Sequence, residues 1–166
     1  MLETIYSLSP FAPVVVFIAS ALDVFFVTGF IFYGVAMMSS VALMHATGMI
    51  SIEMIIVSSY SGTILGNVTN YWAGRLFGKT PVVSQRLRHP KVEKARGYLN
   101  KKGLFIFMAV SRFITFFRPL YALLLGSLAI SFRRFILYES IIALCWILFW
   151  LFIIIQGENL FSYFFN

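Results

Sequence analysis

The chain has 166 residues, of which 60% are hydrophobic and only 11% are charged. Soluble domains are about half apolar and about a quarter charged, so too few polar side chains remain here to cover a soluble surface. The composition therefore excludes an ordinary soluble domain and predicts an integral membrane protein with several apolar segments.

The positive charge lies mainly in one loop. The formal net charge is +7, and 9 of the 13 basic residues lie between Arg75 and Lys102, with apolar segments on both sides. Such a loop is typical of the cytoplasmic face of a membrane and can contact anionic headgroups. We expect no nucleic-acid partner. The two histidines are far apart and no phosphate-loop or dinucleotide motif is present, so we also expect no metal and no cofactor.

The first apolar segment covers residues 11–47 and contains one charge, Asp23. It forms either two short crossings or one helical hairpin that dips into the bilayer and returns, and both alternatives bring residue 48 back to the starting side. Pro10 and Pro13 disfavour a regular helix before about residue 13.

Residues 49–74 are the clearest single span, since about 20 apolar residues are enough to cross a bilayer. Small or polar residues recur in this span at every fourth position: Ser58, Gly62, Gly66, Asn70 and Gly74. This spacing places them on one helix face, where a second helix can approach closely. The face is either a simple packing seam or a seam beside a binding element.

The basic loop contains the sequence HPKVEKARGYLNKKG, residues 89–103. Pro90 suits a first helical turn, and Glu93 suits the positive end of a helix dipole. Gly103 suits the end of the helix. Apolar residues at helical spacing then predict a short amphipathic helix on the cytoplasmic interface: Val92, Ala95, Tyr98 and Leu99.

The length and flanking charges of the segment 103–132 predict that it forms a re-entrant hairpin. As a straight helix it would span about 45 Å, whereas the hydrocarbon core is about 30 Å thick. Basic pairs flank both ends, so both ends prefer the cytoplasm. Pro119 provides the break, because it lacks a backbone donor and disfavours helix at Arg118. Residues 135–156 are then a final crossing, with Glu139 expected as an interfacial carboxylate near its cytoplasmic end.

The predicted fold is therefore an all-α integral membrane protein of one domain, residues 1–166. A hairpin and span (11–74), the basic loop (75–102) and a second hairpin and span (103–156) form an inverted repeat. Transporters built from such repeats place their substrate sites at the shared interface near the bilayer midplane.

Arg112 and Arg118 are the candidate binding residues. An arginine at the bilayer centre costs about 2.5–3.5 kcal/mol on insertion scales, so two in one apolar segment need a reason. If the helix breaks near Pro119, both can face one cavity, where guanidinium groups bind phosphate in bidentate fashion. Asp23 is available to pair with an arginine or to exchange a proton. The alternative is a structural ion pair that fixes the two hairpins together.

Two stretches resemble conserved blocks of the DedA family, also called SNARE-associated or VTT-domain proteins. GTILGNVTNYWAGRLFG (62–78) resembles the family segment G-x-x-x-G-D-x-x-x-Y-x-x-G-R-x-x-G. SRFITFFRPLYALLLGSLAISFRRFILYESIIALCW (111–146) resembles the block R-F-x-P-x-x-R, A-G, Y-R-R-F and a later Trp. The matching positions include Arg112, Arg118 and Gly126, and the resemblance spans roughly residues 11–156.

The resemblance implies two facing re-entrant hairpins and the movement of lipids between leaflets. Bacterial members of the family include translocases of the undecaprenyl phosphate carrier, and proton-motive force is implicated in some. The chain departs from the family at three positions: Val35 replaces the acid of P-G-E, Asn67 replaces the acid of G-D, and Thr115 replaces a proline. Two candidate proton carriers are thus missing, and Asp23 would have to serve alone.

We therefore expect a lipid translocase of the bacterial inner membrane, without covalent chemistry, that moves an anionic phosphate headgroup. Arg112 and Arg118 would hold the phosphate and Asp23 would balance or release it. Helix packing around the cavity is assigned to a further set: Gly62, Gly66, Asn67 and Gly126. The alternatives are a transporter of small solutes or ions that uses the same cavity, and a scaffold that transports nothing. Proton coupling and a homo-oligomeric state are left open.

Overall fold

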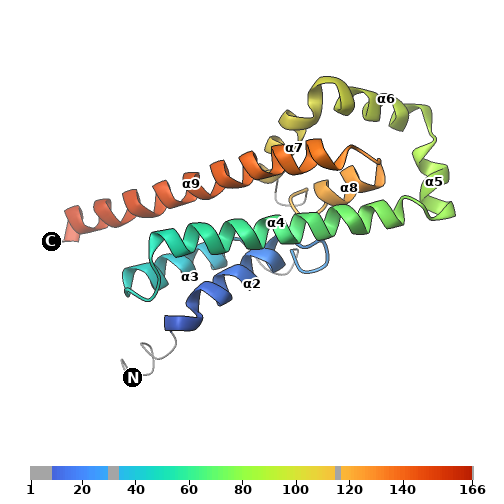
Figure 1. Ribbon diagram of the computed structural model, residues 1–166. Coiled ribbons are helices and arrows are strands. Elements are labelled where there is room, and N and C mark those ends of the chain that lie inside the picture. Colours follow the sequence, from blue (N-terminus) through green and yellow to red (C-terminus); the bar gives the residue numbers. More distant parts are fainter. Residues whose placement is uncertain (1–8, 30–33, 115–116, 166) are drawn as a thin grey trace.

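A computed structural model describes residues 9–29, 34–114 and 117–165, and every regular element in these ranges is helical (Figure 1). The all-α prediction is confirmed for this part of the chain. Two of the three positions where the chain departs from the family motifs, Thr115 and the side chain of Val35, lie outside what the structure describes.

The first half of the chain forms two shorter helices and one long helix. A short 3₁₀ turn, Ser9–Phe11, leads into α2, Ala12–Val24, so the helix begins where the two prolines predict. α3 spans Gly34–Ala46 and α4 spans Ile52–Phe77. Ser51 caps α4, because its hydroxyl accepts a hydrogen bond from the backbone N–H of Met54 at 3.3 Å.

The basic loop forms α5, Pro81–Leu87, and α6, Pro90–Tyr98. Pro90 and Glu93 lie in the first turn of α6, as predicted. Gly103 does not end the helical path: a π-helical turn, Leu99–Gly103, connects α6 directly to α7, Leu104–Phe113. The residues of the predicted amphipathic face differ in their burial. Leu99 is buried and Val92 packs on the core, whereas Ala95 and Tyr98 are exposed.

The last third of the chain forms α8, Tyr121–Ser127, and α9, Phe132–Phe165. α7 and α8 are separated by a non-helical turn that contains Arg118 and the buried Pro119. The predicted break therefore exists, but it starts earlier than expected, because the backbone is already extended at Ile114.

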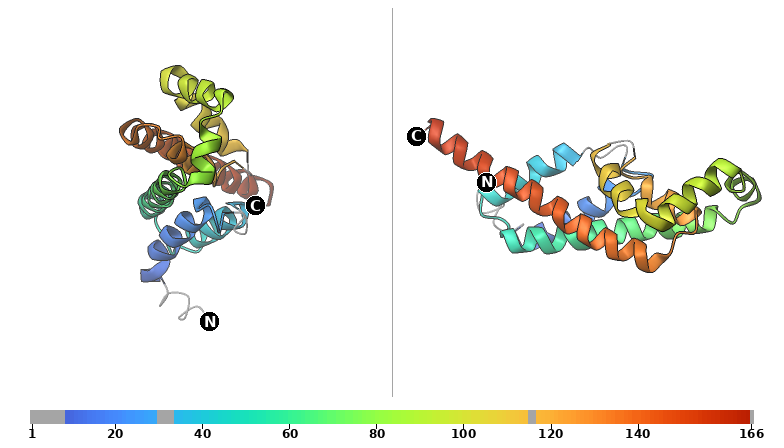
Figure 2. Two further views of the ribbon diagram at one scale, coloured as in Figure 1. Left: turned by 90° about the vertical axis from the view of Figure 1, so that its right-hand side faces the viewer. Right: turned by 90° about the horizontal axis from the view of Figure 1, so that it is seen from above.

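The two long helices organise the molecule. α4 and α9 run in opposite directions and cross at an angle (Figures 1 and 2). α2 packs along the first part of α4 and α8 packs along its second part. The α2–α3 and α7–α8 pairs open toward opposite ends of α4, so that the ends of α2 and α7 approach each other near its middle (Figure 1).

Glycines on α4 allow this close packing. A Cβ at Gly62 would lie 2.3 Å from the carbonyl oxygen of Phe17 in α2, and one at Gly66 would lie 2.5 Å from the side chain of Val24. A Cβ at Gly74 would lie 1.9 Å from the carbonyl oxygen of Leu123 in α8. One face of α4 thus contacts both helix pairs.

Only one helix in the described residues, over Phe132–Gln156, is both long and apolar enough to cross a membrane. The expectation that residues 49–74 are the clearest span is wrong. α4 has 26 residues, about 39 Å of helix, but its buried face carries polar side chains that lower its hydropathy.

Gly74→Ala is expected to lower the free energy of unfolding by about 1–3 kcal/mol, because the new methyl group would overlap the backbone of α8. The unfolding midpoint of the purified protein in detergent measures this. Gly97→Ala in α6 is the matched control, since a Cβ there meets nothing within 4 Å and alanine favours helix. Equal midpoints for the two variants would contradict the assigned seam.

Candidate functional site

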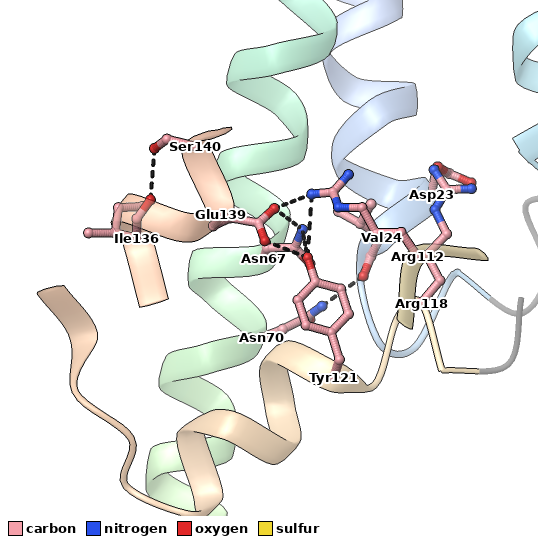
Figure 3. A network of polar contacts seen from close by, with 10 residues as sticks. All are labelled: Asp23, Val24, Asn67, Asn70, Arg112, Arg118, Tyr121, Ile136, Glu139 and Ser140. Atoms are coloured by element: carbon pink, nitrogen blue, oxygen red, sulfur yellow. Dashed lines mark hydrogen bonds and ion pairs between the residues drawn. The ribbon is translucent and has the colours of Figure 1, made fainter. Parts of the chain in front are cut away.

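Asp23 and Arg118 form an ion pair between the two helix pairs. Asp23 lies at the end of α2 and is 4% exposed, while Arg118 lies in the turn between α7 and α8. The guanidinium of Arg118 donates to Oδ2 of Asp23 (Figure 3). The guanidinium carbon also lies 5.8 Å from the centre of the Trp146 ring of α9, within the range of a cation–π contact.

Arg112 forms a second ion pair, with Glu139 of α9. Two further side chains complete a hydrogen-bonded cluster (Figure 3). The hydroxyl of Tyr121 donates to Oε2 of Glu139 at 2.6 Å, and the amide of Asn67 donates to Oε1 at 2.8 Å. That amide also donates to the Tyr121 oxygen at 2.9 Å. The cluster therefore joins α4, α7, α8 and α9.

The structure corrects the interpretation of Glu139. The sequence placed it near the interface as a snorkelling or surface-paired carboxylate, but it is 0% exposed and accepts hydrogen bonds on both carboxylate oxygens. Tyr121 was not assigned a role, although it too is buried. The available signal was that ionisable groups within apolar segments face the protein interior by default.

Asn70 connects the ends of the two helix pairs. Its side-chain amide donates to the carbonyl oxygen of Val24 at 2.7 Å and to that of Pro119 at 3.2 Å. Its side-chain oxygen accepts from the backbone N–H of Phe26 at 3.0 Å. One asparagine thus satisfies backbone groups of both turns, where regular helical hydrogen bonding has stopped.

The two arginines differ in their surroundings. The side chain of Arg112 is 2% exposed and is enclosed by Glu139 and Tyr121. The side chain of Arg118 is 16% exposed. The Nε atoms of both arginines are buried and have no hydrogen-bond partner among the described residues. Each arginine is therefore paired with its own carboxylate, and Arg118 is the more accessible cation.

The residues assigned to helix packing divide between two roles. Gly62 and Gly66 contact α2, whereas Asn67 belongs to the polar cluster. Gly126 of α8 lies against α4, where a Cβ would be 1.9 Å from the carbonyl oxygen of Tyr71. The structure thus brings Asp23, Asn67 and both arginines into one neighbourhood (Figure 3), and it leaves the glycines at the helix seams.

The described residues form only helices, one of them long and apolar enough to span a membrane, and they hold paired charges in the interior. These are features of a membrane protein. The sequence model of the VTT domain matches residues 11–156, and the chain belongs to this family, whose domain defines the DedA family of membrane proteins. No curated protein and no solved structure matches the chain.

Removing either partner of the Arg112–Glu139 pair is expected to lower the free energy of unfolding by about 3–5 kcal/mol, because one buried charge is left uncompensated. We expect Arg112→Gln and Glu139→Gln together to cost less than the sum of the two single changes. Denaturant unfolding of the four proteins measures this coupling. The exposed pair Arg96–Glu93, 3.6 Å apart, is the control and should show little coupling. Additive losses at the buried pair would contradict the assignment.

Asn67→Asp is expected to destabilise the fold, because a second carboxylate would face Glu139 across the present 2.8 Å contact. Adding Glu139→Gln to the same chain should restore much of the loss, since one carboxylate then again faces Arg112. Melting temperatures of the single and double variants test this. A double variant less stable than Asn67→Asp alone would show that residue 67 cannot take over the pairing with Arg112.

Proposed function

We propose that this DedA-family protein moves an anionic lipid headgroup, a phospholipid or a polyprenyl phosphate, across the bilayer and thereby supports membrane homeostasis. The observation that carries the proposal is the Arg118–Asp23 pair, a partly accessible cation between the ends of two helix pairs. A guanidinium there can exchange its carboxylate partner for a phosphate, which guanidinium groups bind in bidentate fashion.

In this proposal the α2–α3 and α7–α8 pairs are re-entrant hairpins that enter from opposite faces, with the basic loop cytoplasmic. Their opposed directions along α4 support this (Figure 1). The backbone carbonyl and N–H groups that Asn70 satisfies are the groups that non-helical backbone at membrane depth would expose. A headgroup from either leaflet then crosses only half of the bilayer to reach the paired charges.

The phosphate binds Arg118 first, because Arg118 is the more exposed arginine and, among the described residues, is paired with a single carboxylate, Asp23. Asp23 is the group displaced, and it returns to the guanidinium when the headgroup leaves. Arg112 stays paired with Glu139 and Tyr121 and adds a second positive charge close to the first. This exchange forms no covalent bond, so the proposal requires no enzymatic chemistry.

An apolar groove favours a lipid over a soluble anion. It has a volume of about 360 Å³ and runs from Tyr98, at the end of α6, along α7 to Ile114 and Phe117. Phe117 lies in the turn that carries Arg118. An acyl or prenyl chain fits such a surface, whereas a soluble ion gains nothing from it. A lipid can therefore keep its chain against α7 while its headgroup reaches the arginine.

Arg118→Gln is expected to reduce headgroup translocation by at least about tenfold, because a neutral amide cannot replace the charge-assisted contact to phosphate. Proteoliposomes with leaflet-resolved detection measure the rate for undecaprenyl phosphate and for common phospholipids, with and without a pH gradient. Lys79→Gln, an exposed change of the same charge, should leave the rate unchanged.

Three outcomes of this assay would decide against the proposal. Full translocation by an Arg112→Ala/Arg118→Ala variant would show that neither residue is needed to bind the headgroup. Flux of a soluble anion without any lipid movement would favour the solute transporter. A folded protein that moves nothing in any lipid mixture, and whose Arg118→Lys variant keeps its cellular function, would favour the scaffold.

A further inference from the structure

A polar cavity lies away from the buried ion pairs, between the π-helical turn and the first turns of α9. Its volume is about 310 Å³, roughly that of ten water molecules in the liquid. Its lining comes from the π turn, α7 and α9: Leu99, Asn100, Lys101, Leu104, Phe105, Arg134 and Tyr138. Among these described lining residues none is acidic, so the two cations have no counter-charge within the cavity.

The cavity is preorganised by one contact. The guanidinium of Arg134 donates to the backbone carbonyl of Asn100 at 2.7 Å, which fixes α9 to the π turn. This contact uses one of the five guanidinium donors. The π turn also brings Lys101 to the same cavity, and inserted π turns are frequent at functional sites. The adjacent Glu139 offers no counter-charge, because it is buried against Arg112.

We propose that this cavity is a second phosphate-binding site, in which Lys101 and Arg134 hold the phosphate group of an anionic lipid or free phosphate. Tyr138 and Asn100 add polar groups, and Leu99, Leu104 and Phe105 form an apolar wall. Basic cavities at the cytoplasmic ends of membrane helices suit anionic headgroups. This site does not depend on translocation by the buried pairs.

Arg134 and Glu139 are five residues apart on α9, which is about 8 Å along the helix axis and about 140° around it. The cavity therefore lies on a different side of α9 from the Arg112–Glu139 pair, and it is a site separate from the buried cluster.

The test uses the full chain in detergent micelles that contain equal amounts of phosphatidylglycerol and phosphatidylcholine, with native mass spectrometry of retained lipid. Wild type is expected to retain phosphatidylglycerol preferentially. Lys101→Gln/Arg134→Gln should lower its affinity for this lipid about tenfold or more, because the charge-assisted contacts are lost. Lys91→Gln/Lys94→Gln removes the same charge from exposed positions on α6 and should stay within about twofold of wild type.

Inorganic phosphate, added at increasing concentration, identifies the source of the ligand. Competition with the lipid supports a site for the phosphate group itself, and absence of competition supports a site for the lipid headgroup. Unchanged retention in Lys101→Gln/Arg134→Gln, or an equal loss in the α6 control, would overturn the proposal. Arg118→Gln should retain phosphatidylglycerol here, so failure of this site is distinguishable from failure of translocation.

Discussion

The pairing of buried charges is the constraint on which this structure depends. A lone arginine in an apolar interior is too costly to keep, so each guanidinium needs a carboxylate within reach. Arg112 and Arg118 obtain theirs from different parts of the chain, Glu139 of α9 and Asp23 of α2. The two ion pairs therefore fix the α7–α8 turn between helices that are far apart in sequence. The helices must pack closely for these contacts to form, and the glycines of α4 allow that approach.

Local structure was largely predictable because its causes lie in short stretches of sequence. The prolines set the start of α2 and α6, and the four-residue spacing of small residues identified the face of α4 that packs. The partner of Arg112 was not predictable in this way. Glu139 follows Arg112 by 27 residues, and only the return of the chain through α8 places the two together. The hydropathy pattern placed Glu139 near the start of the last helix. The sequence around Glu139 does not indicate that α4 and α8 cover this part of the helix.

Asn67 shows how Arg112 is paired without an acid at this position of α4. The family segment has an acid at this position of α4, whereas here the acid in contact with Arg112 is Glu139 of α9, 2.8 Å from the amide of Asn67. A carboxylate at both positions would place two negative charges against one guanidinium. An amide at position 67 instead donates to the carboxylate and to the Tyr121 hydroxyl. Arg112 is therefore paired through a carboxylate of α9, and the amide of Asn67 on α4 supports that carboxylate.

The two pairs differ in a way that, under the proposed function, gives them different roles. Glu139 accepts hydrogen bonds from Arg112, Tyr121 and Asn67, so exchanging this partner would break contacts with three helices at once. Asp23 has one recorded ionic partner in the described residues, Arg118, and exchanging it breaks one contact. A site that binds and releases an anion needs one cation that can change partner and a scaffold that stays in place while it does. In the proposed function the Arg112 cluster is this scaffold, and Arg118 is the cation that changes partner, at the junction where Asn70 bonds to both turns.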